Sequence, residues 1–527
     1  MNPTRRSTLR RLSRCAALLA AGRVFAGPDL RLPTLGTPHF DTDPFTLGVA
    51  SGQPRPHGVV LWTRLAPQPQ QVDGGMPGAL IPVHWQVAED ARFGRLVQSG
   101  TVLADPTQAH SVRVRIDHLA PARTYHYRFL AGNATSPVGR TRTAPAEQAE
   151  VARLRLALAS CQHYEQGWFA VHREIAAADV DLVLFVGDYI YEGSRRRYRV
   201  RPHETTAAPV TLTQYRQRYA TYKADPDLQA AHAAHPWILA WDDHEVRNDY
   251  AGPHGDEDLD PEIFVAIRAN AYQAYFEHQP LDPDQLPGPQ GMRMHDHFRW
   301  GRLAELWTLD GRQYRSVQGC NRDDQTAGGH LRWRCAELAD ERRTMLGHAQ
   351  EEWLHAGLRT ATARWKLVGQ ATQISAWGVR PPLGRPVVYT DGWDGYPQAR
   401  ARMLARLGHE GIDNVVFLGG DVHRHVAANL RVRPNDPASP VVASEFVTTS
   451  VTTAGMPGPA LSLIRRSNPD ILHARSDERG FMEVTVTPDS VHCVARATDF
   501  PVLPHSRLRT QAHFRVMAGH PGIQPVP

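Results

Sequence analysis

Lysine and long apolar runs are what this sequence most clearly lacks. Of its 59 basic side chains, only Lys223 and Lys366 are lysines. Six arginines and no acidic residue lie within residues 1–26, so the net charge of +5 comes from that segment and the remaining chain is slightly negative. We therefore expect no nucleic-acid binding. No stretch reaches the roughly 20 apolar residues that a transmembrane helix needs.

Cysteine is also scarce, with five residues in 527. Cys320 and Cys335 are close in a polar stretch, which predicts a disulfide if the protein is exported; two free thiols are the alternative. Cys493 alternates with apolar residues and is expected to be a small core side chain.

The N-terminal segment has the features of an export signal. Arg5 and Arg6 precede an apolar patch at residues 16–21, and small residues allow cleavage after Ala26. This resembles a twin-arginine signal, so residues 1–26 are predicted to be a signal peptide. The twin-arginine machinery would then be a partner, and the mature protein would be periplasmic or extracellular. The alternative is an unprocessed basic tail.

A chain of 527 residues is expected to form more than one domain. Residues 43–148 alternate with period two in several short runs, which indicates an all-β domain. Leu119-Ala-Pro121 followed by Tyr125-His-Tyr127 resembles a fibronectin III or immunoglobulin-like sandwich with a tyrosine corner.

Residues 152–500 read as a second, α/β domain. Helices fit 168–178, 262–277, 338–361 and 397–408, and a β-hairpin fits 482–495. Residues 501–527 are treated as a C-terminal tail of unassigned role. The strand candidates are Leu154–Ser160, Leu182–Asp188, Trp237–Asp242, Leu303–Leu309, Trp365–Gln370 and Val415–Asp421.

Five of these strand ends carry side chains that bind metals. Ligands of open α/β sheets gather at the carboxyl ends of the strands, so five such ends in order predict a metal site. The runs are Ser160-Cys161-Gln162-His163, Gly187-Asp188-Tyr189-Ile190-Tyr191, Trp241-Asp242-Asp243-His244-Glu245 with Arg247-Asn248-Asp249, Val368-Gly369-Gln370, and Gly419-Gly420-Asp421-Val422-His423.

These motifs resemble the PhoD-like alkaline phosphatase and phosphodiesterase branch of the metallophosphoesterases. That branch carries Ser-Cys-Gln, Gly-Asp-x-x-Tyr, Trp-Asp-Asp-His and Gly-Asp-x-His, all present here. Two further runs, 309–315 and 347–354, also match. The resemblance implies an α/β/β/α sandwich with an N-terminal β-sandwich, a secreted phosphoesterase, and iron with calcium. The middle histidine of the wider superfamily is missing, and Gln370 is the nearest candidate for its place.

The residue types support the same metals. Cys161, Asp188, Tyr191 and His423 combine thiolate, carboxylate, phenolate and imidazole, a set that favours Fe³⁺. Oxygen ligands suit Ca²⁺, and one iron with one or more calcium ions is expected in preference to Mn²⁺ or Zn²⁺. The oxygen ligands are Asp242, Asp243 and Asp421, with Asn248 or Asp249 in reach. Which of Asp242 and Asp243 binds the metal stays open.

Such a site predicts hydrolysis of phosphomonoesters or phosphodiesters by direct attack of a metal-bound hydroxide. His244 would stabilise charge or protonate the leaving group, and Arg247, Asn248 and His425 would hold phosphate oxygens or serve only in packing. His163 is expected to be a solvated residue at the rim. The arginine-rich loop 194–201 would be either an anion-docking surface or an ordinary solvated loop.

Three other functions remain open. A purple acid phosphatase also uses Gly-Asp-x-x-Tyr and a β-sandwich, but Cys161 and Asp421 argue against it. Phospholipase D activity occurs in the same branch. A non-catalytic cell-surface binding protein would be expected to lack ligand residues that are present here. A monomer is expected.

Overall fold

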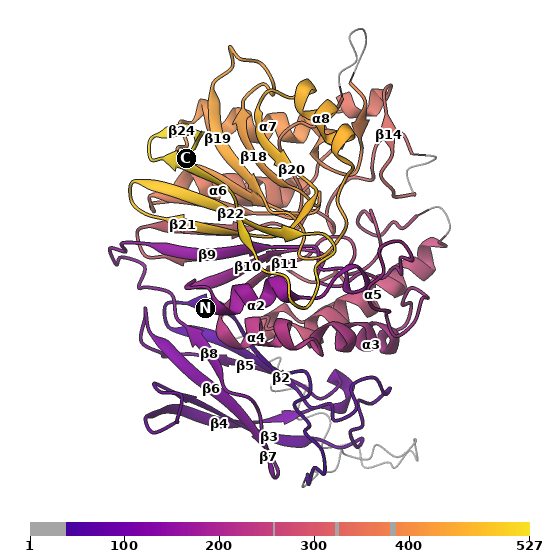
Figure 1. Ribbon diagram of the computed structural model, residues 1–527, viewed down its shortest axis with the longest axis vertical. Coiled ribbons are helices and arrows are strands. Elements are labelled where there is room, and N and C mark those ends of the chain that lie inside the picture. Colours follow the sequence, from indigo (N-terminus) through magenta and orange to yellow (C-terminus); the bar gives the residue numbers. More distant parts are fainter. Residues whose placement is uncertain (1–37, 257–258, 322–325, 380–385, 527) are drawn as a thin grey trace, which may run out of the picture.

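The computed structural model describes residues 38–256, 259–321, 326–379 and 386–526. The predicted signal peptide, residues 1–26, lies outside these ranges. Figure 1 shows two stacked sheets with helices on both outer faces, and a smaller β region below them. This arrangement confirms the expected α/β/β/α sandwich with an N-terminal β-sandwich.

The larger sheet has ten strands. At its centre lie four parallel strands, β9, β10, β11 and β1, and antiparallel strands extend this set on both sides, β21 next to β9 and β2 next to β1. In spatial order the strands are β24 (His520–Pro525), β23 (Arg509–Met517), β22 (Ser490–Asp499), β21 (Glu478–Val486), β9 (Leu154–Ala159), β10 (Leu182–Val186), β11 (Pro236–Ala240), β1 (Val49–Arg55), β2 (Gly58–Arg64) and β5 (Ser111–Ile116).

The second sheet has seven strands, of which β13, β15, β17 and β19 run parallel. Apolar side chains from both sheets, among them Leu184, Leu367 and Met482, form one buried core between them. In order the strands are β12 (Asp296–Trp300), β13 (Ala304–Thr308), β15 (Trp365–Gly369), β17 (Val415–Gly419), β19 (Val441–Val447), β18 (His425–Arg431) and β20 (Ile471–Arg475).

Helices cover the outer face of each sheet. Helices α2 (Ala170–Ala177), α3 (Leu212–Lys223), α4 (Pro226–Ala234) and α5 (Pro261–His278) share a core with the ten-stranded sheet. Helices α6 (His348–Thr360) and α7 (Pro397–His409) cover the other sheet, and α8 (Gly458–Ser467) packs beside β18 and β20. The predicted helix 338–361 begins ten residues later than expected, after Gly347, whose φ of +75° is not helical. The periodicity did not predict α3, α4 and α8.

The N-terminal β region is continuous with the α/β core. Strands β4 (Leu96–Ala104), β3 (Ile81–Ala88), β6 (Thr124–Ala131), β7 (Ala134–Thr135) and β8 (Gly139–Arg142) form a small sheet that packs on β1, β2 and β5. Tyr125 makes the tyrosine corner, since its hydroxyl accepts a hydrogen bond from the Ala120 amide at 3.0 Å. Because β1 pairs in parallel with β11, one sheet of this sandwich is also the edge of the large sheet.

The expectation about the C-terminal end of the chain needs correction. Residues 501–527, predicted as a separate tail, contribute β23 and β24 to the large sheet where they are described. A two-stranded ribbon of β14 (Leu331–Arg332) and β16 (Val388–Tyr389) lies apart from both sheets. Within the described ranges, none of the helices has the length and apolarity required to cross a membrane.

Candidate active site

The first two motifs are joined through their backbones. Beyond the ends of β9 and β10, the Cys161 amide donates to the Gly187 carbonyl and the Gln162 amide donates to the Asp188 carbonyl, both at 3.1 Å. The Gln162 side chain also donates to the Tyr189 carbonyl at 2.8 Å. Gln162 therefore serves to align the thiol-bearing and carboxylate-bearing loops.

Four of the predicted ligands stand on left-handed backbone. The φ angles are +60° at Cys161, +59° at Asp188, +61° at Asp421 and +51° at His423. Residues other than glycine rarely adopt such angles, and strained positions of this kind cluster at functional sites. Gly187 precedes Asp188 with φ +104°, and a Cβ there would lie 2.6 Å from the Cβ of Asp242.

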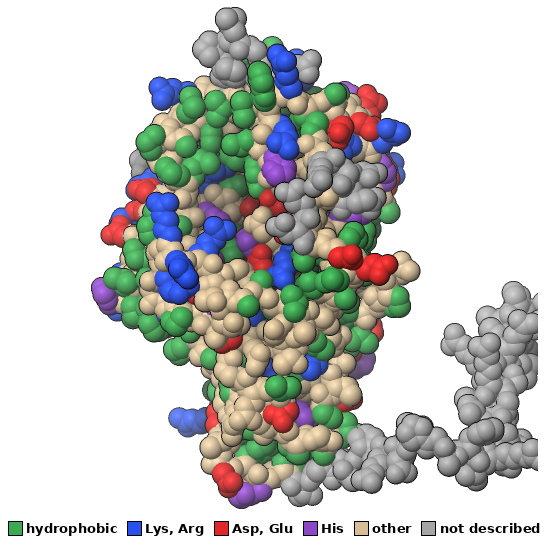
Figure 2. All heavy atoms as spheres, turned by 90° about the vertical axis from the view of Figure 1, so that its right-hand side faces the viewer, with side chains coloured by type: hydrophobic (Ala, Val, Ile, Leu, Met, Phe, Trp, Pro, Cys, Tyr) green, Lys and Arg blue, Asp and Glu red, His purple; other side chains and the backbone are tan. Residues whose placement is uncertain are grey.

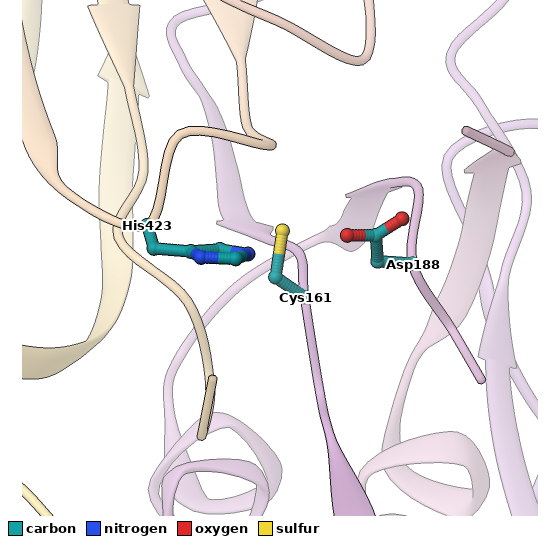
Figure 3. Close-up of side chains that lie close together, drawn as sticks. All are labelled: Cys161, Asp188 and His423. Carbon is teal, nitrogen blue, oxygen red and sulfur yellow. The ribbon is translucent and has the colours of Figure 1, made fainter. Parts of the chain in front are cut away.

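The first cluster joins three of these ligands. One ligand atom each of Cys161, Asp188 and His423 lies within 4.8 Å of the others, and the three side chains converge from separate loops (Figure 3). The Tyr191 hydroxyl donates to Asp188 Oδ2 at 2.7 Å and lies 3.2 Å from His423 Nε2. The four residues predicted for the iron site are therefore brought together at one point.

The electrostatics of this cluster fit a bound cation. Burial, followed by the neighbouring negative charges, raises the pKa of Cys161, of Asp188 and of Tyr191 well above the ordinary values. Asp188 Oδ1 is buried without a hydrogen-bond partner in the described part of the chain. Three acidic groups and an imidazole at one buried point suit a cation that stabilises their charged forms.

A second cluster consists of carboxylates. Asp243, Asp249 and Asp391 bring one oxygen each within 4.8 Å of the others, and Asp188, Asp243 and His244 form an equivalent group between the two clusters. Burial and the repulsion of Asp391 and Asp243 raise the pKa of Asp249 to about 7. A set of oxygen ligands with excess negative charge is the kind that binds Ca²⁺.

Arg312 holds the carboxylates of this region in place. Its guanidinium is 1% exposed, pairs with Asp242, and lies 2.9 Å from Asp391 Oδ1 and 3.8 Å from Asp243 Oδ2. Although burial opposes ionisation, Arg312 helps to keep the pKa of Asp243 at about 2. The structure thus directs Asp242 toward Arg312, whereas Asp243 belongs to two of the three ligand groups. Asp421 bonds to the Thr372 hydroxyl.

His244 is oriented by a buried carboxylate. Its Nδ1 lies 2.7 Å from Glu192 Oε2, and its ring packs against that of Tyr191, with centroids 4.1 Å apart and planes tilted by 32°. Burial disfavours the imidazolium, but Glu192 and the surrounding aspartates together raise the pKa of His244 well above its ordinary value. A histidine held in its protonated form beside the two clusters can donate a proton.

The three residues expected to hold phosphate oxygens or to serve only in packing lie in different surroundings. Arg247 is buried and donates to the Pro209 carbonyl at 2.9 Å. Asn248 is exposed, and its backbone N–H donates to Glu192 Oε1 at 2.9 Å. His425 is completely buried, and its Nδ1 accepts from the Thr449 amide. Of these three residues, Asn248 is the one whose side chain lines a cavity.

Four predictions about single residues or pairs now have structural answers. His163 is completely buried, so its prediction as a solvated rim residue was wrong. Gln370 bonds to the Thr372 carbonyl and Trp393 and belongs to none of the ligand groups in the described ranges. Cys320 and Cys335 form the predicted disulfide, with Cα atoms 5.8 Å apart, and Cys493 is buried in the core as predicted.

The functional residues that the sequence did not indicate are Glu192, Arg312 and Asp391. Arg312 lies in a run that matched the resembled family without a known role, and Glu192 directly follows Tyr191. Both residues therefore lie in or beside motifs that the sequence makes visible. Asp391 follows the two-residue strand β16 in an irregular segment, so no local pattern distinguishes it.

A polar cavity of about 550 Å³ adjoins the carboxylate cluster. Figure 2 shows this side of the molecule hollowed, with acidic and histidine side chains in the hollow and basic side chains around it. The cavity reaches Asp249 and Asn248, and its wall includes Gly329, His330 and Arg332 from the segment closed by the disulfide. The Gly329 amide donates to Asp249 Oδ2 at 2.9 Å, which connects that segment to the cluster.

Nearly the whole chain is similar to proteins of one known family. Residues 156–495 match the family described as PhoD-like phosphatase, and residues 32–145 match the N-terminal domain of that family. Alkaline phosphatase D of Bacillus subtilis (strain 168) is 41% identical over 497 residues, which cover 93% of this chain and 83% of that protein. A solved structure described as "Structure of PhoD" is 40% identical, covers 93% of both chains and superposes with a TM-score of 0.87.

Proposed function

Since the chain belongs to the PhoD-like phosphatase family and is a phosphoric ester hydrolase, we propose that it hydrolyses phosphomonoesters and phosphodiesters directly with water. Catalysis would require Fe³⁺ together with one or more Ca²⁺ ions. The observation that carries this proposal is the convergence of Cys161, Asp188 and His423 within 4.8 Å, with Tyr191 in hydrogen-bond contact.

The residues present fit both ions. Cys161, Asp188, Tyr191 and His423 would hold the iron, because thiolate and phenolate ligands suit a trivalent ion. Asp243, Asp249 and Asp391 would hold calcium, with Asp421 and Asp242 adjacent to them. When bound, the ions supply positive charge for phosphate oxygens and lower the pKa of coordinated water.

The chain's own side chains contribute three further functions. His244, fixed by Glu192, donates a proton to the oxygen of the departing alcohol. Arg312 keeps the carboxylates in position while remaining itself out of reach of solvent. The polar cavity beside Asp249 receives the alcohol portion of the ester. Asn248 would contact that portion, whereas the buried contacts of Arg247 indicate a structural role.

Paired cysteine variants test this assignment. Cys161 and Cys493 are both buried free cysteines, and Cys493 lies in the core between the sheets. Cys161→Ala is expected to lose iron and ester hydrolysis together, whereas Cys493→Ala should retain both. Iron content is measured by elemental analysis and hydrolysis with p-nitrophenyl phosphate and bis(p-nitrophenyl) phosphate. A Cys161→Ala protein with full iron content and activity would refute the metal assignment.

Direct hydrolysis has a separate test. An ester whose phosphorus is chiral through its oxygen isotopes should give phosphate of inverted configuration, because a single in-line attack by water involves one displacement. Retention of configuration would require two displacements and therefore a nucleophilic side chain.

We also propose export in the folded state through the twin-arginine route, directed by residues 1–26. The disulfide between Cys320 and Cys335 supports this, since such bonds persist in oxidising compartments. Replacing Arg5 and Arg6 together by lysine should retain the protein in the cytoplasm. Unchanged export of that variant would contradict the proposal.

A further inference from the structure

A buried carboxylate attaches the arginine-rich loop to the first catalytic motif. Glu165 is completely buried and lies four residues after Cys161. Its oxygens accept from the Ser194 hydroxyl at 3.0 Å, the Arg195 amide at 2.6 Å and the His203 amide at 3.2 Å. The Arg199 guanidinium pairs with the same carboxylate at 3.2 Å. The loop is therefore anchored to the first catalytic motif through Glu165, while residues 195–198 remain exposed to solvent.

His163 presents a donor without an acceptor at the same place. Its Nδ1 accepts from the Glu165 amide at 3.2 Å, which places the ring proton of the neutral imidazole on Nε2. The ring lies 4.6 Å from that of Tyr191. Its Nε2 is buried and has no hydrogen-bond partner in the described ranges of the chain. Leaving a buried donor unpaired is costly, so such a donor beside a catalytic cluster points to an external acceptor.

Glu165 also connects Arg195 to His163. The backbone amide of Arg195 donates to Glu165 Oε2 at 2.6 Å, and the backbone amide of Glu165 donates to His163 Nδ1 at 3.2 Å. The Arg195 side chain is exposed, and it pairs with no carboxylate among the residues that the structure describes. The loop therefore holds an uncompensated positive charge on the segment that is bound to His163 through Glu165.

We infer that His163 Nε2–H and the Arg195 guanidinium bind non-bridging oxygens of the substrate phosphate beside Cys161, Asp188 and His423. This inference rests on the proposed function and deepens it. A cation recognises a dianionic phosphate better than a monoanionic one, so the pair favours monoesters over diesters. Glu165 is the positioning residue, because it fixes both the histidine segment and the arginine loop.

Adjacent arginines provide a matched test on the metal-loaded enzyme. Arg195→Gln should lower kcat/KM for p-nitrophenyl phosphate by about 10-fold or more, the loss expected for a charged hydrogen bond. The loss for bis(p-nitrophenyl) phosphate should be smaller, and inhibition by inorganic phosphate should weaken. Arg196→Gln, an exposed neighbour, should leave all three quantities unchanged. Equal losses in both variants, or none in Arg195→Gln, would overturn the inference.

A histidine variant separates substrate binding from metal binding. His163→Phe keeps an aromatic ring against Tyr191 but removes the donor. It should lose monoester activity with normal iron content, whereas a loss of iron would overturn the inference by making His163 a metal ligand. If His163→Phe fails to fold, the kinetics of Arg195→Gln alone test the inference. Failure of the wild-type enzyme to hydrolyse either ester would instead refute the proposed function, independently of both variants.

Discussion

Replacement of Arg312 by methionine tests how the carboxylate cluster is held together. Methionine preserves much of the volume and removes the guanidinium that pairs with Asp242 and Asp391. Asp391 retains two donors, the Gln318 amide at 2.7 Å and the Arg315 guanidinium at 3.2 Å. Asp242 Oδ1 has no comparable replacement, and Asp242 Oδ2 is already unpartnered in the described residues. The loss of stability should therefore come mainly from the carboxylate of Asp242, which is left without a partner.

The magnitude follows from burial. Removing one partner of a buried ion pair costs about 3–5 kcal/mol, because the remaining charge is left uncompensated. Protonation of Asp242 reduces that cost, since burial already raises its pKa to about 8. We therefore expect the metal-free Arg312→Met protein to lose about 3 kcal/mol of unfolding free energy, the lower end of that range.

Urea unfolding in the presence of a chelator measures this loss. Arg342→Met is the control, because that arginine lies on the surface and its guanidinium pairs with the nearby Asp340, and it should show no measurable change. Added Ca²⁺ should restore part of the stability of Arg312→Met, since a bound cation replaces the missing positive charge and stabilises the folded state. Equal stability of Arg312→Met and wild type in chelator would refute the reasoning, as would complete indifference to Ca²⁺.

Three further predictions concern the scaffold of the site. Gly187→Ala, at φ +104° and facing the Cβ of Asp242, should cost about 1–3 kcal/mol of backbone strain and displace that residue; unchanged urea midpoint and activity would contradict this. Burial lowers the pKa of His172 from 6.5 to about 3, so the unfolded chain binds a proton that the folded chain does not. Stability should therefore fall as pH decreases from 6.5 toward 3, and His172→Phe should reduce the slope of unfolding free energy by up to about 1.4 kcal/mol per pH unit; an unchanged slope would contradict the burial argument. Replacing Cys320 and Cys335 together by serine should lower the free energy of unfolding by about 3 kcal/mol, the value for a loop of this length. The double variant should also bind Ca²⁺ more weakly, because the segment that the disulfide closes contacts Asp249 through the Gly329 amide. If a calcium titration shows the same affinity for the double variant and the wild type, this second part is refuted.

The ligand-bearing strand ends could be predicted from sequence because their signal is local. A buried apolar strand that ends in Cys161, Asp188 or Asp421 places that side chain at the sheet edge, whatever the rest of the chain does. The same holds for the alternating strands of the N-terminal sandwich and for the tyrosine corner at Tyr125. Six central strands were therefore located within a few residues of their observed bounds.

Only the tertiary structure decided which polar residues complete the site. Asp391, Glu192 and Arg312 act through partners 52 to 79 residues away, and nothing in their immediate sequence records those contacts. His163 looked solvated because its burial depends on Tyr191 and His203 stacking against it. Likewise, β1 pairs with β11 across 185 residues. No local pattern in the sequence could therefore show that the N-terminal sandwich shares a sheet with the α/β core. Periodicity and strand-end motifs are properties of adjacent residues, whereas burial and charge compensation are properties of neighbours that only folding brings together.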